Sequence, residues 1–248
     1  MNSWRDNIFF TLVEPKEQGN IGASARAIKN MGFKNLCLVN PPDIDNEAYW
    51  FACNANDILE SAIVYKTLDD AIRDKAIVVG TTRRLGKRRG LIIPVSDAVR
   101  KIQEFSINNR VAILFGREDK GLFNEEIEKC GFSITIPTNH EQPSLNLAQA
   151  ILIVTYELSK LELTNSENNG KELKLVNIEE LTILYSRISN SLKLLGYIPK
   201  GDRNLEKKIM TNLKHFIGRA GLTNWELKML HGMCSQIEKN IQNEKKLI

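Results

Sequence analysis

The sequence predicts an α/β fold with a parallel sheet, followed by a small helical domain. Up to residue 162, short apolar runs rich in β-branched residues alternate with stretches of helical spacing. This alternation is typical of parallel strands joined by crossover helices. After a polar segment, the rest of the 248-residue chain shows only helical spacing. A large sheet domain and a second, helical part are therefore expected.

Six strands are expected from the apolar runs. They cover residues 8–13, 35–40, 62–65, 76–81, 110–116 and 132–137. Helices are expected between and after them, at residues 20–31, 67–73, 94–105, 123–129 and 146–161. Together these elements give the sheet domain the bounds 1–162.

The helical part is expected at residues 177–248, after a linker at 163–176. The linker contains Asn-Asn-Gly, which breaks helical periodicity. Ile178, Leu181 and Leu184 begin an amphipathic stripe with a spacing of three to four residues. Because three helices alone lie near the lower size limit for independent stability, we expect them to dock on the sheet domain or on a second copy of the chain.

Composition excludes several classes of protein. The chain has 42% hydrophobic and 26% charged residues, and no run approaches the roughly 18 apolar residues of a membrane span. The N-terminus lacks the apolar core of a signal peptide, so a cytoplasmic protein without a membrane partner is expected. Four widely spaced cysteines without a C-x-x-C pair predict neither a disulfide framework nor a metal site. The net charge of +4 permits an anionic partner without requiring one.

The stretch GNIGASARAIKNMG, residues 19–32, follows the first apolar run and is the first candidate binding motif. A dinucleotide-binding turn needs Gly-x-Gly-x-x-Gly, whereas Gly19, Gly22 and Ala25 leave this stretch one glycine short. No acidic residue closes the second strand to hold a ribose, so a nicotinamide enzyme is disfavoured. The small residues of the first helical turn predict that a large group approaches it closely. Arg26 lies off the apolar stripe of this helix and by itself predicts only a solvated side chain.

Two later segments are further candidates for a ligand site. LFGREDKGLFNEEI, residues 114–127, places Gly116 at the end of a strand, where parallel α/β sheets bind ligands. IPTNHEQPSLNLAQA, residues 136–150, places Ser144 at the start of the last helix of the domain, where free backbone N–H groups can bind a polar ligand. Taken alone, the first segment fits equally well a turn that needs glycine. Taken alone, the second fits equally well a helix that needs an N-cap residue.

Taken in order, NIGASARAIKNMGF and the two later segments resemble the three motifs of the SpoU class of SPOUT RNA ribose 2′-O-methyltransferases. LVNP after the second strand, VVGTTRR after the fourth and the helical extension look most like the TrmJ branch, which modifies the anticodon loop of tRNA. The resemblance covers residues 8–160. Three matched motifs in the same order are specific, whereas any one alone is not.

The resemblance implies more than spacing predicts. Members of this class bind S-adenosylmethionine in a deep trefoil knot in the C-terminal part of the sheet domain, act as homodimers and use no metal. Knots are so rare that the expectation of one depends on the resemblance alone. The expected substrate is tRNA rather than DNA, with cytidine, or also uridine, methylated at position 32.

Two alternatives stay open. In the first, the chain is an enzyme of the same class that acts on ribosomal RNA or at another tRNA position. In the second, it is a noncatalytic RNA-binding relative. The presence of Arg26, Glu118 and Asn146 favours an enzyme.

The resemblance also assigns roles to individual residues. It implies a catalytic Arg26, supported by Asn20, Glu118 and Asn146. Because a guanidinium group rarely loses its proton, we favour a fixed cation that stabilises the forming alkoxide over a general base. The residues expected to contact the cofactor are Thr81, Thr82, Arg83, Gly116, Glu118, Ile136, Pro143, Ser144, Leu145 and Asn146.

Clustered basic residues predict where RNA binds. The segment TTRRLGKRRG has no acidic residue, and its like charges repel one another unless an anion is bound, so we expect it to contact phosphate. A second basic group lies on the helical extension and predicts a larger RNA footprint. With Arg26, the expected RNA-binding residues are Arg83, Arg84, Lys87, Arg88, Arg89, Lys207 and Lys208.

Overall fold

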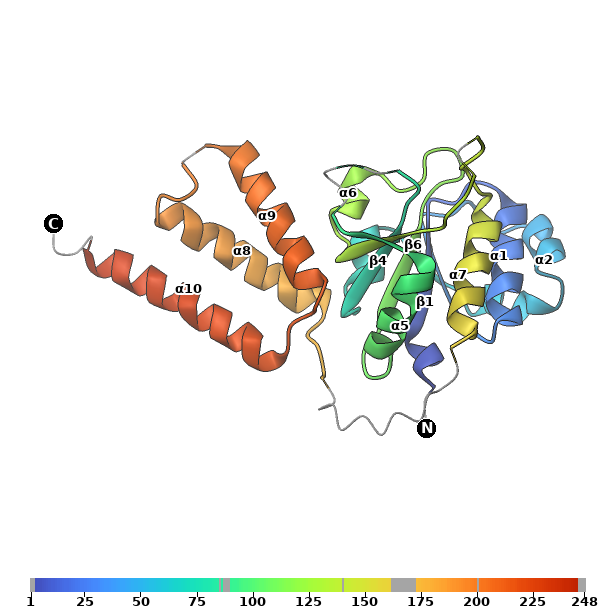
Figure 1. Cartoon of the computed structure of the whole chain (residues 1–248), viewed down its shortest axis with the longest axis horizontal. Coiled ribbons are helices and arrows are strands. Elements are labelled where there is room, and N and C mark those ends of the chain that lie inside the picture. Colours follow the sequence, from blue (N-terminus) through green and yellow to red (C-terminus); the bar gives the residue numbers. More distant parts are fainter. Residues whose placement is uncertain are drawn as a thin grey trace.

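The computed structural model describes residues 3–84, 86, 90–139, 141–161, 173–199 and 201–244. Figure 1 shows a sheet domain and, beside it, a module of three long helices. Seven strands form one sheet in the order β3-β2-β1-β6-β4-β7-β5, and every pairing is parallel. The strands are β1 Ile8–Val13, β2 Asn35–Val39, β3 Ile63–Tyr65, β4 Ile77–Thr81, β5 Ile92–Pro94, β6 Val111–Phe115 and β7 Phe132–Thr135.

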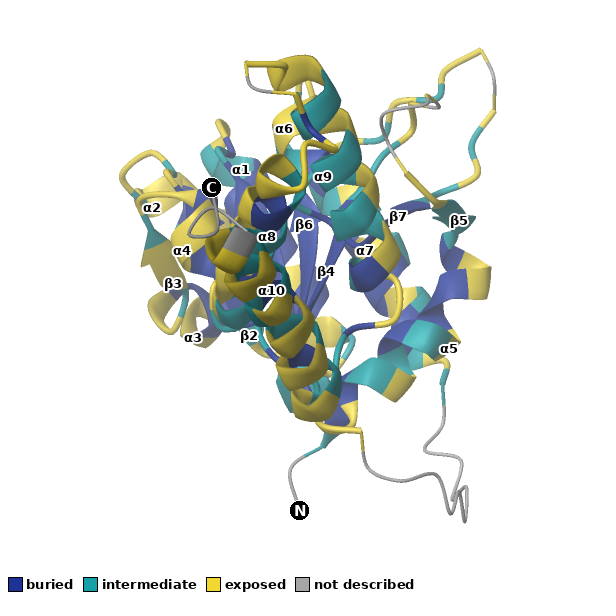
Figure 2. Ribbon diagram, turned by 90° about the vertical axis from the view of Figure 1, so that its left-hand side faces the viewer, coloured by how far each residue is buried: buried dark blue, intermediate teal, exposed yellow. Residues whose placement is uncertain are grey.

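Helices cover both faces of the sheet. One face carries α1 Gln18–Asn30, α2 Asn46–Ala52, α3 Asn56–Glu60, α5 Val95–Ser106 and α7 Leu147–Ser159, and the other carries α4 Leu68–Ile72 and α6 Asn124–Ile127. Successive residues of a strand point to opposite faces, so Leu12 packs toward α1 while Val13 packs toward α4. All six residues of β1 are consequently buried. Figure 2 shows the central strands β6 and β4 in the colour of buried residues.

The expected parallel α/β fold is confirmed, and all six expected strands are present. Strand β5 was not expected, because it has three residues, contains a proline and pairs only with β7. The short helices α2 and α3 were also not expected. The buried residues of α2 are Ala48 and Ala52, which carry a weak periodic signal because they are small, and α3 has only five residues. The strand order tells which strands pair with each other, but it does not tell whether the chain passes through one of its own loops. The expected trefoil knot therefore stays a prediction.

The group that approaches the first turn of α1 is helix α2. A Cβ atom added to Gly22 would lie 2.0 Å from the carbonyl oxygen of Ala48. The two helices therefore touch backbone to backbone, and the small residues of the motif serve packing within the chain.

The module has its own small core. It contains α8 Ile178–Leu194, α9 Arg203–Gly218 and α10 Asn224–Glu244. Val176 is buried among their apolar side chains and its N–H donates to the carbonyl of Leu222 at 2.8 Å. The end of the expected linker thus packs with the module, while residues 163–172 of that linker lie outside the described residues.

The module docks on the sheet domain through free groups at the start of α8. The N–H groups of Ile178 and Glu179 donate to the carbonyls of Lys75 and Arg73, at 2.9 and 3.1 Å. These amides belong to the first turn of a helix and lack partners inside it. Of the two expected docking modes, the structure shows the one on the sheet domain. In the part of the chain that the structure describes, no helix is both long and apolar enough to cross a membrane.

Replacing Gly22 with alanine should lower the free energy of unfolding by about 1–3 kcal/mol, because the added methyl group meets backbone that moves only with the whole of α2. Thermal unfolding measures the effect. The control Asn30→Ala, at an exposed position of the same helix, should change the free energy by no more than about 0.5 kcal/mol. An unchanged Tm for Gly22→Ala would contradict the close contact of the two helices.

Candidate functional site

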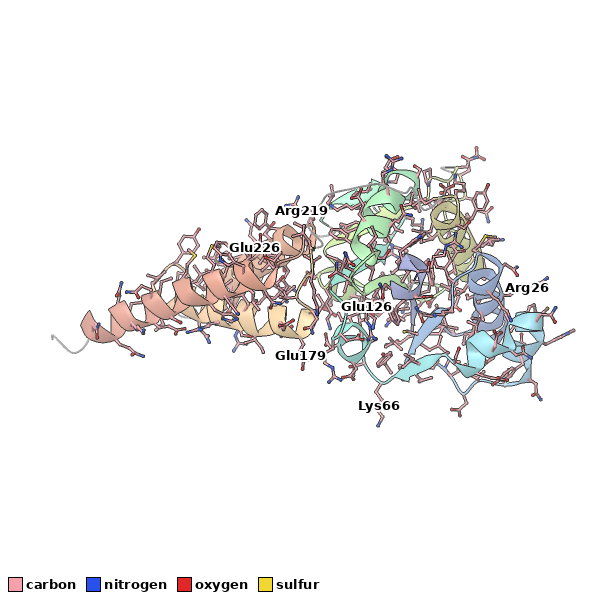
Figure 3. All side chains as sticks on the ribbon, turned by 90° about the horizontal axis from the view of Figure 1, so that it is seen from below. Arg26, Lys66, Glu126, Glu179, Arg219 and Glu226 are labelled. Carbon is pink, nitrogen blue, oxygen red and sulfur yellow. The ribbon has the colours of Figure 1, made fainter. Side chains whose placement is uncertain are left out.

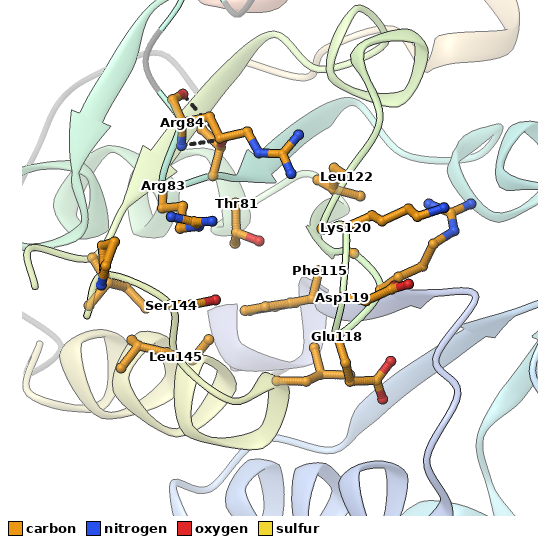
Figure 4. A pocket seen from close by; sticks show the side chains of 18 of the residues that line it. Thr81, Arg83, Arg84, Phe115, Glu118, Asp119, Lys120, Leu122, Ser144 and Leu145 are labelled. Carbon is orange, nitrogen blue, oxygen red and sulfur yellow. Dashed lines mark hydrogen bonds between the residues drawn. The ribbon is translucent and has the colours of Figure 1, made fainter. Parts of the chain in front are cut away.

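A pocket opens at the carboxyl ends of three neighbouring strands. Its walls come from the end of β4 with the residues after it, from residues 115–122 at and after the end of β6, and from residues 143–145 with the first turn of α7 (Figure 4). In parallel α/β sheets, ligands bind beyond this edge. The strand order explains the site, because β6, β4 and β7 are neighbours in the sheet although other elements separate them in the sequence.

Most residues expected to contact a cofactor line this pocket. Asn146 does not line it and instead begins α7, where its side-chain oxygen accepts the N–H of Ala148 at 2.8 Å. Further lining residues such as Phe115, Leu122 and Ile134 were missed, although strand alternation and the glycine-rich segment placed them nearby. The expected residues that do line the pocket are Thr81, Thr82, Arg83, Gly116, Glu118, Ile136, Pro143, Ser144 and Leu145.

The pocket combines apolar walls with a charged rim. Phe115, Leu122 and Ile134 are buried and form part of the walls, whereas Arg84 and Lys120 are exposed at the rim. Figure 4 shows Arg83 and Arg84 on one side of the opening and Asp119 and Lys120 across it. This arrangement suits a ligand with a flat apolar part and a charged end.

A chain of hydrogen bonds joins the three motif segments. The Asn20 amide nitrogen donates to Glu118 Oε1 at 3.0 Å, and the Asn146 amide nitrogen donates to Asn20 Oδ1 at 2.7 Å. These residues are 98 and 126 positions apart in the sequence. The structure therefore brings together the three residues expected to support catalysis.

Glu118 also accepts hydrogen bonds from the backbone in front of α1. The N–H groups of Lys16 and Glu17 donate to its carboxylate at 3.1 and 3.2 Å. Amides near the N-terminus of a helix lack partners within it, and a negative charge there is favourable. The carboxylate thus fixes the start of α1 to the loop that lines the pocket.

The loop is held from its other side by Arg117. Its buried guanidinium forms ion pairs with Glu14 at 2.9 Å and Glu126 at 3.0 Å, and it stacks on the ring of Phe123 at 4.0 Å. Two parallel hydrogen bonds reach Glu126. Because the guanidinium binds the Glu126 carboxylate through two hydrogen bonds at once, it gives the loop a defined conformation.

Arg26 lies outside the pocket of its own chain. It is exposed on α1, and its guanidinium donates to Cys53 Sγ at 3.4 Å. Arg26 lies six positions after Asn20, which corresponds to about 9 Å along the helix axis. Figure 3 places Arg26 at the side of the sheet domain that faces away from the helical module.

The expected RNA-binding residues are divided between two places. Arg83 and Arg84 lie at the pocket, while residues 87–89 fall outside the described part of the chain. Lys207 and Lys208 are exposed on α9, and the ammonium group of Lys207 lies 3.4 Å from the Glu128 carboxylate.

The sequence matches two protein families. Residues 7–156 match the SpoU rRNA Methylase family. This chain belongs to that family. Residues 179–246 match the C-terminal domain of the tRNA methyltransferase TrmJ, so the expected relation to the TrmJ branch is confirmed as well.

Relatives resemble the chain over almost its whole length. The tRNA (cytidine/uridine-2′-O-)-methyltransferase TrmJ of Citrobacter koseri is 35% identical over 242 residues, which are 94% of this chain and 97% of that protein. The crystal structure of TrmJ from Z. mobilis superposes with a TM-score of 0.79 at 31% identity, covering 93% of this chain and 98% of that one. The SpoU methyltransferase AviRb of Streptomyces viridochromogenes, solved with the cofactor AdoMet, shares the fold at 22% identity and a TM-score of 0.50, covering 62% of this chain and 60% of that one.

Glu118→Gln should destabilise the protein by about 1–3 kcal/mol, since the new NH₂ group faces N–H donors and leaves one of them without an acceptor. Chemical denaturation measures the loss. Glu125→Gln, at an exposed position nearby, is the matched control and should unfold like the native chain. Equal stability of the two variants would contradict the connecting role of Glu118.

Proposed function

We propose that this chain transfers a methyl group from S-adenosylmethionine to a ribose 2′-hydroxyl in the anticodon loop of tRNA. The observation that carries the proposal is the pocket, where the three motif segments meet through Glu118, Asn20 and Asn146. The match of residues 179–246 to the C-terminal domain of TrmJ favours tRNA over ribosomal RNA. The name of the C. koseri relative supports cytidine or uridine as the acceptor, and we place it at position 32 of the tRNA.

The lining of the pocket fits S-adenosylmethionine. Leu122, Ile134 and Ile136 offer apolar surface for an adenine ring, and the basic side chains of Arg83 and Lys120 suit a carboxylate. When bound, S-adenosylmethionine supplies an electrophilic methyl group on a sulfonium sulfur. The residues that would hold it are Thr81, Thr82, Arg83, Gly116, Glu118, Ile136, Pro143, Ser144 and Leu145, with Asn146 behind them at the start of α7.

A ribose hydroxyl is a weak nucleophile, so the chain must place it in line with the methyl group and stabilise the charge that forms. Arg26 supplies that stabilisation as a fixed cation, because a guanidinium keeps its proton near neutral pH. The hydrogen bonds from Asn20 to Glu118 and from Asn146 to Asn20 keep the start of α1 in place beside the pocket.

A homodimer explains how Arg26 reaches a pocket. Trp50 and Phe51 on α2, and Leu152 and Tyr156 on α7, are 79%, 45%, 41% and 50% exposed. These two helices pack on either side of α1, so the apolar side chains surround the helix that carries Arg26. Exposed apolar patches of this kind mark interfaces. A second copy covers the patch and receives Arg26 at its own pocket.

RNA phosphates are bound by basic side chains at the rim of the pocket and on α9. The rim contributes Arg83 and Arg84, and α9 contributes Lys207 and Lys208. From the sequence alone we add Lys87, Arg88 and Arg89 to the residues that bind RNA. DNA is not a substrate because it lacks the 2′-hydroxyl that accepts the methyl group. A tRNA-modifying enzyme of this kind acts in the cytoplasm.

Methyl transfer to unmodified tRNA tests the proposal directly. The purified chain, labelled S-adenosylmethionine and tRNA transcripts should give one ribose-methylated nucleotide, located by nuclease digestion and mass spectrometry at position 32. A transcript with 2′-deoxycytidine there should accept no label. Label in another tRNA position or in ribosomal RNA would replace the proposed substrate, and no transfer to any RNA would indicate a noncatalytic RNA-binding protein.

Arg26→Ala should lower kcat about 100-fold or more, because the charge on the forming alkoxide loses its fixed cation. The affinity for S-adenosylmethionine, measured by calorimetry, should stay near the native value, since Arg26 does not line the pocket of its own chain. Lys29→Ala, at another exposed position of α1, is the control and should keep native activity. A collapse of cofactor affinity with a high residual rate would assign Arg26 to cofactor binding.

A further inference from the structure

Helix α9 touches the sheet domain through a pair of glycines. A Cβ atom added to Gly131 would lie 2.1 Å from the Gly218 carbonyl oxygen, and one added to Gly218 would lie 2.5 Å from Gly131 Cα. Neither glycine has a positive φ. The backbone conformation would therefore accept other residues, and only the close contact of the two chain segments requires glycine.

Two further contacts extend this interface. The ring of His215, nearly one turn before Gly218 in α9, lies where a Cβ atom on Gly90 would be 2.9 Å from its Nδ1 atom. Lys207, in the first turns of the same helix, forms an ion pair with Glu128 of the sheet domain. Figures 1 and 2 accordingly show α9 beside α6.

The parts of the sheet domain that α9 touches are connected to the pocket. Gly90 lies near the end of the segment between β4 and β5, and Arg83 and Arg84 at the pocket rim lie near the start of that segment. The N–H of Gly131 donates to the carbonyl of Val78 in β4 at 2.9 Å. Glu128 follows α6, which the ion pair of Glu126 with Arg117 ties to the pocket loop.

Helix α9 carries several exposed cations. They lie along its length and at its end, so that the helix offers several contacts to an extended polyanion. Figure 3 shows Arg219 at the boundary with the sheet domain. The exposed cations are Arg203, Lys207, Lys208 and Arg219.

We propose that the Gly131–Gly218 contact joins α9 and the pocket rim into one RNA-binding surface, which selects a folded tRNA over an isolated stem-loop. This inference rests on the proposed function. A rigid connection holds the second set of cations at a high effective concentration once the first set has bound RNA. Only an RNA long enough to reach from the pocket rim to α9 gains from this, and a short stem-loop at the pocket does not.

Gly131→Ala and Gly218→Ala test the proposal, since each inserts a methyl group into the same contact from opposite sides. The measured quantity is kcat/KM for methylation of whole tRNA and of an anticodon stem-loop with the same sequence. In both variants the preference for whole tRNA should fall at least about tenfold. Stem-loop kcat/KM and the affinity for S-adenosylmethionine should remain native.

Gly232→Ala is the matched control, because this glycine also lies in a helix of the module and a Cβ atom there meets nothing within 4 Å. It should keep the native preference. If the native chain does not methylate the stem-loop at all, the expected result is the same fall in kcat/KM for whole tRNA alone. His215→Ala, which removes a contact without adding a clash, should shift the preference in the same direction even if both glycine variants fail to fold.

Three outcomes separate the two proposals. If the glycine variants keep the native preference for whole tRNA, the glycine contact does not select RNA and this inference is wrong. An equal fall for tRNA and stem-loop also overturns it, because the contact would then support the pocket itself. A native chain that methylates no tRNA would instead contradict the proposed function.

Discussion

The rest of the site depends on the hydrogen bonds that the carboxylate of Glu118 accepts. It accepts N–H groups from the backbone before α1 and from Asn20, which in turn accepts the amide of Asn146. One half-buried side chain thereby fixes the start of α1, the pocket loop and the start of α7 relative to one another. Without it, the backbone amides before α1 would lose their acceptor, and the amide of Asn20 would keep only its bond to Glu17.

The order of the strands brings these segments within reach. Strands β1, β6, β4 and β7 are adjacent in the sheet, so the residues that follow them meet at one edge. Periodicity predicts which residues form strands, because a strand covered on both faces is a continuous apolar run. It does not predict β5, whose three residues are held by pairing with β7 alone. Nor does it predict α2, whose buried face consists largely of alanines.

The residues of the candidate site that lie within short sequence motifs were predictable from the sequence. The later two motifs identified six of the expected cofactor residues that line the pocket, and the segment after the fourth strand identified the other three. The three motifs also contain the hydrogen-bonded Glu118, Asn20 and Asn146. Distances between segments were not predictable, because they are set by tertiary packing. For that reason the neighbour of Gly22 proved to be α2, and Arg26 lies outside the pocket of its own chain. The glycine pair between the domains left no periodic signal at all.

The backbone contact at Gly22 has a consequence for how activity responds to dilution. Because α1 and α2 touch without intervening side chains, Arg26 and the apolar residues of α2 move as one rigid body. In the proposed homodimer, the event that buries Trp50 is therefore the same event that delivers Arg26 to the partner copy. Association and catalytic competence are then linked by mass action, and specific activity becomes a function of enzyme concentration. Such an enzyme loses its turnover when it dissociates, even though each separated chain still holds a complete pocket.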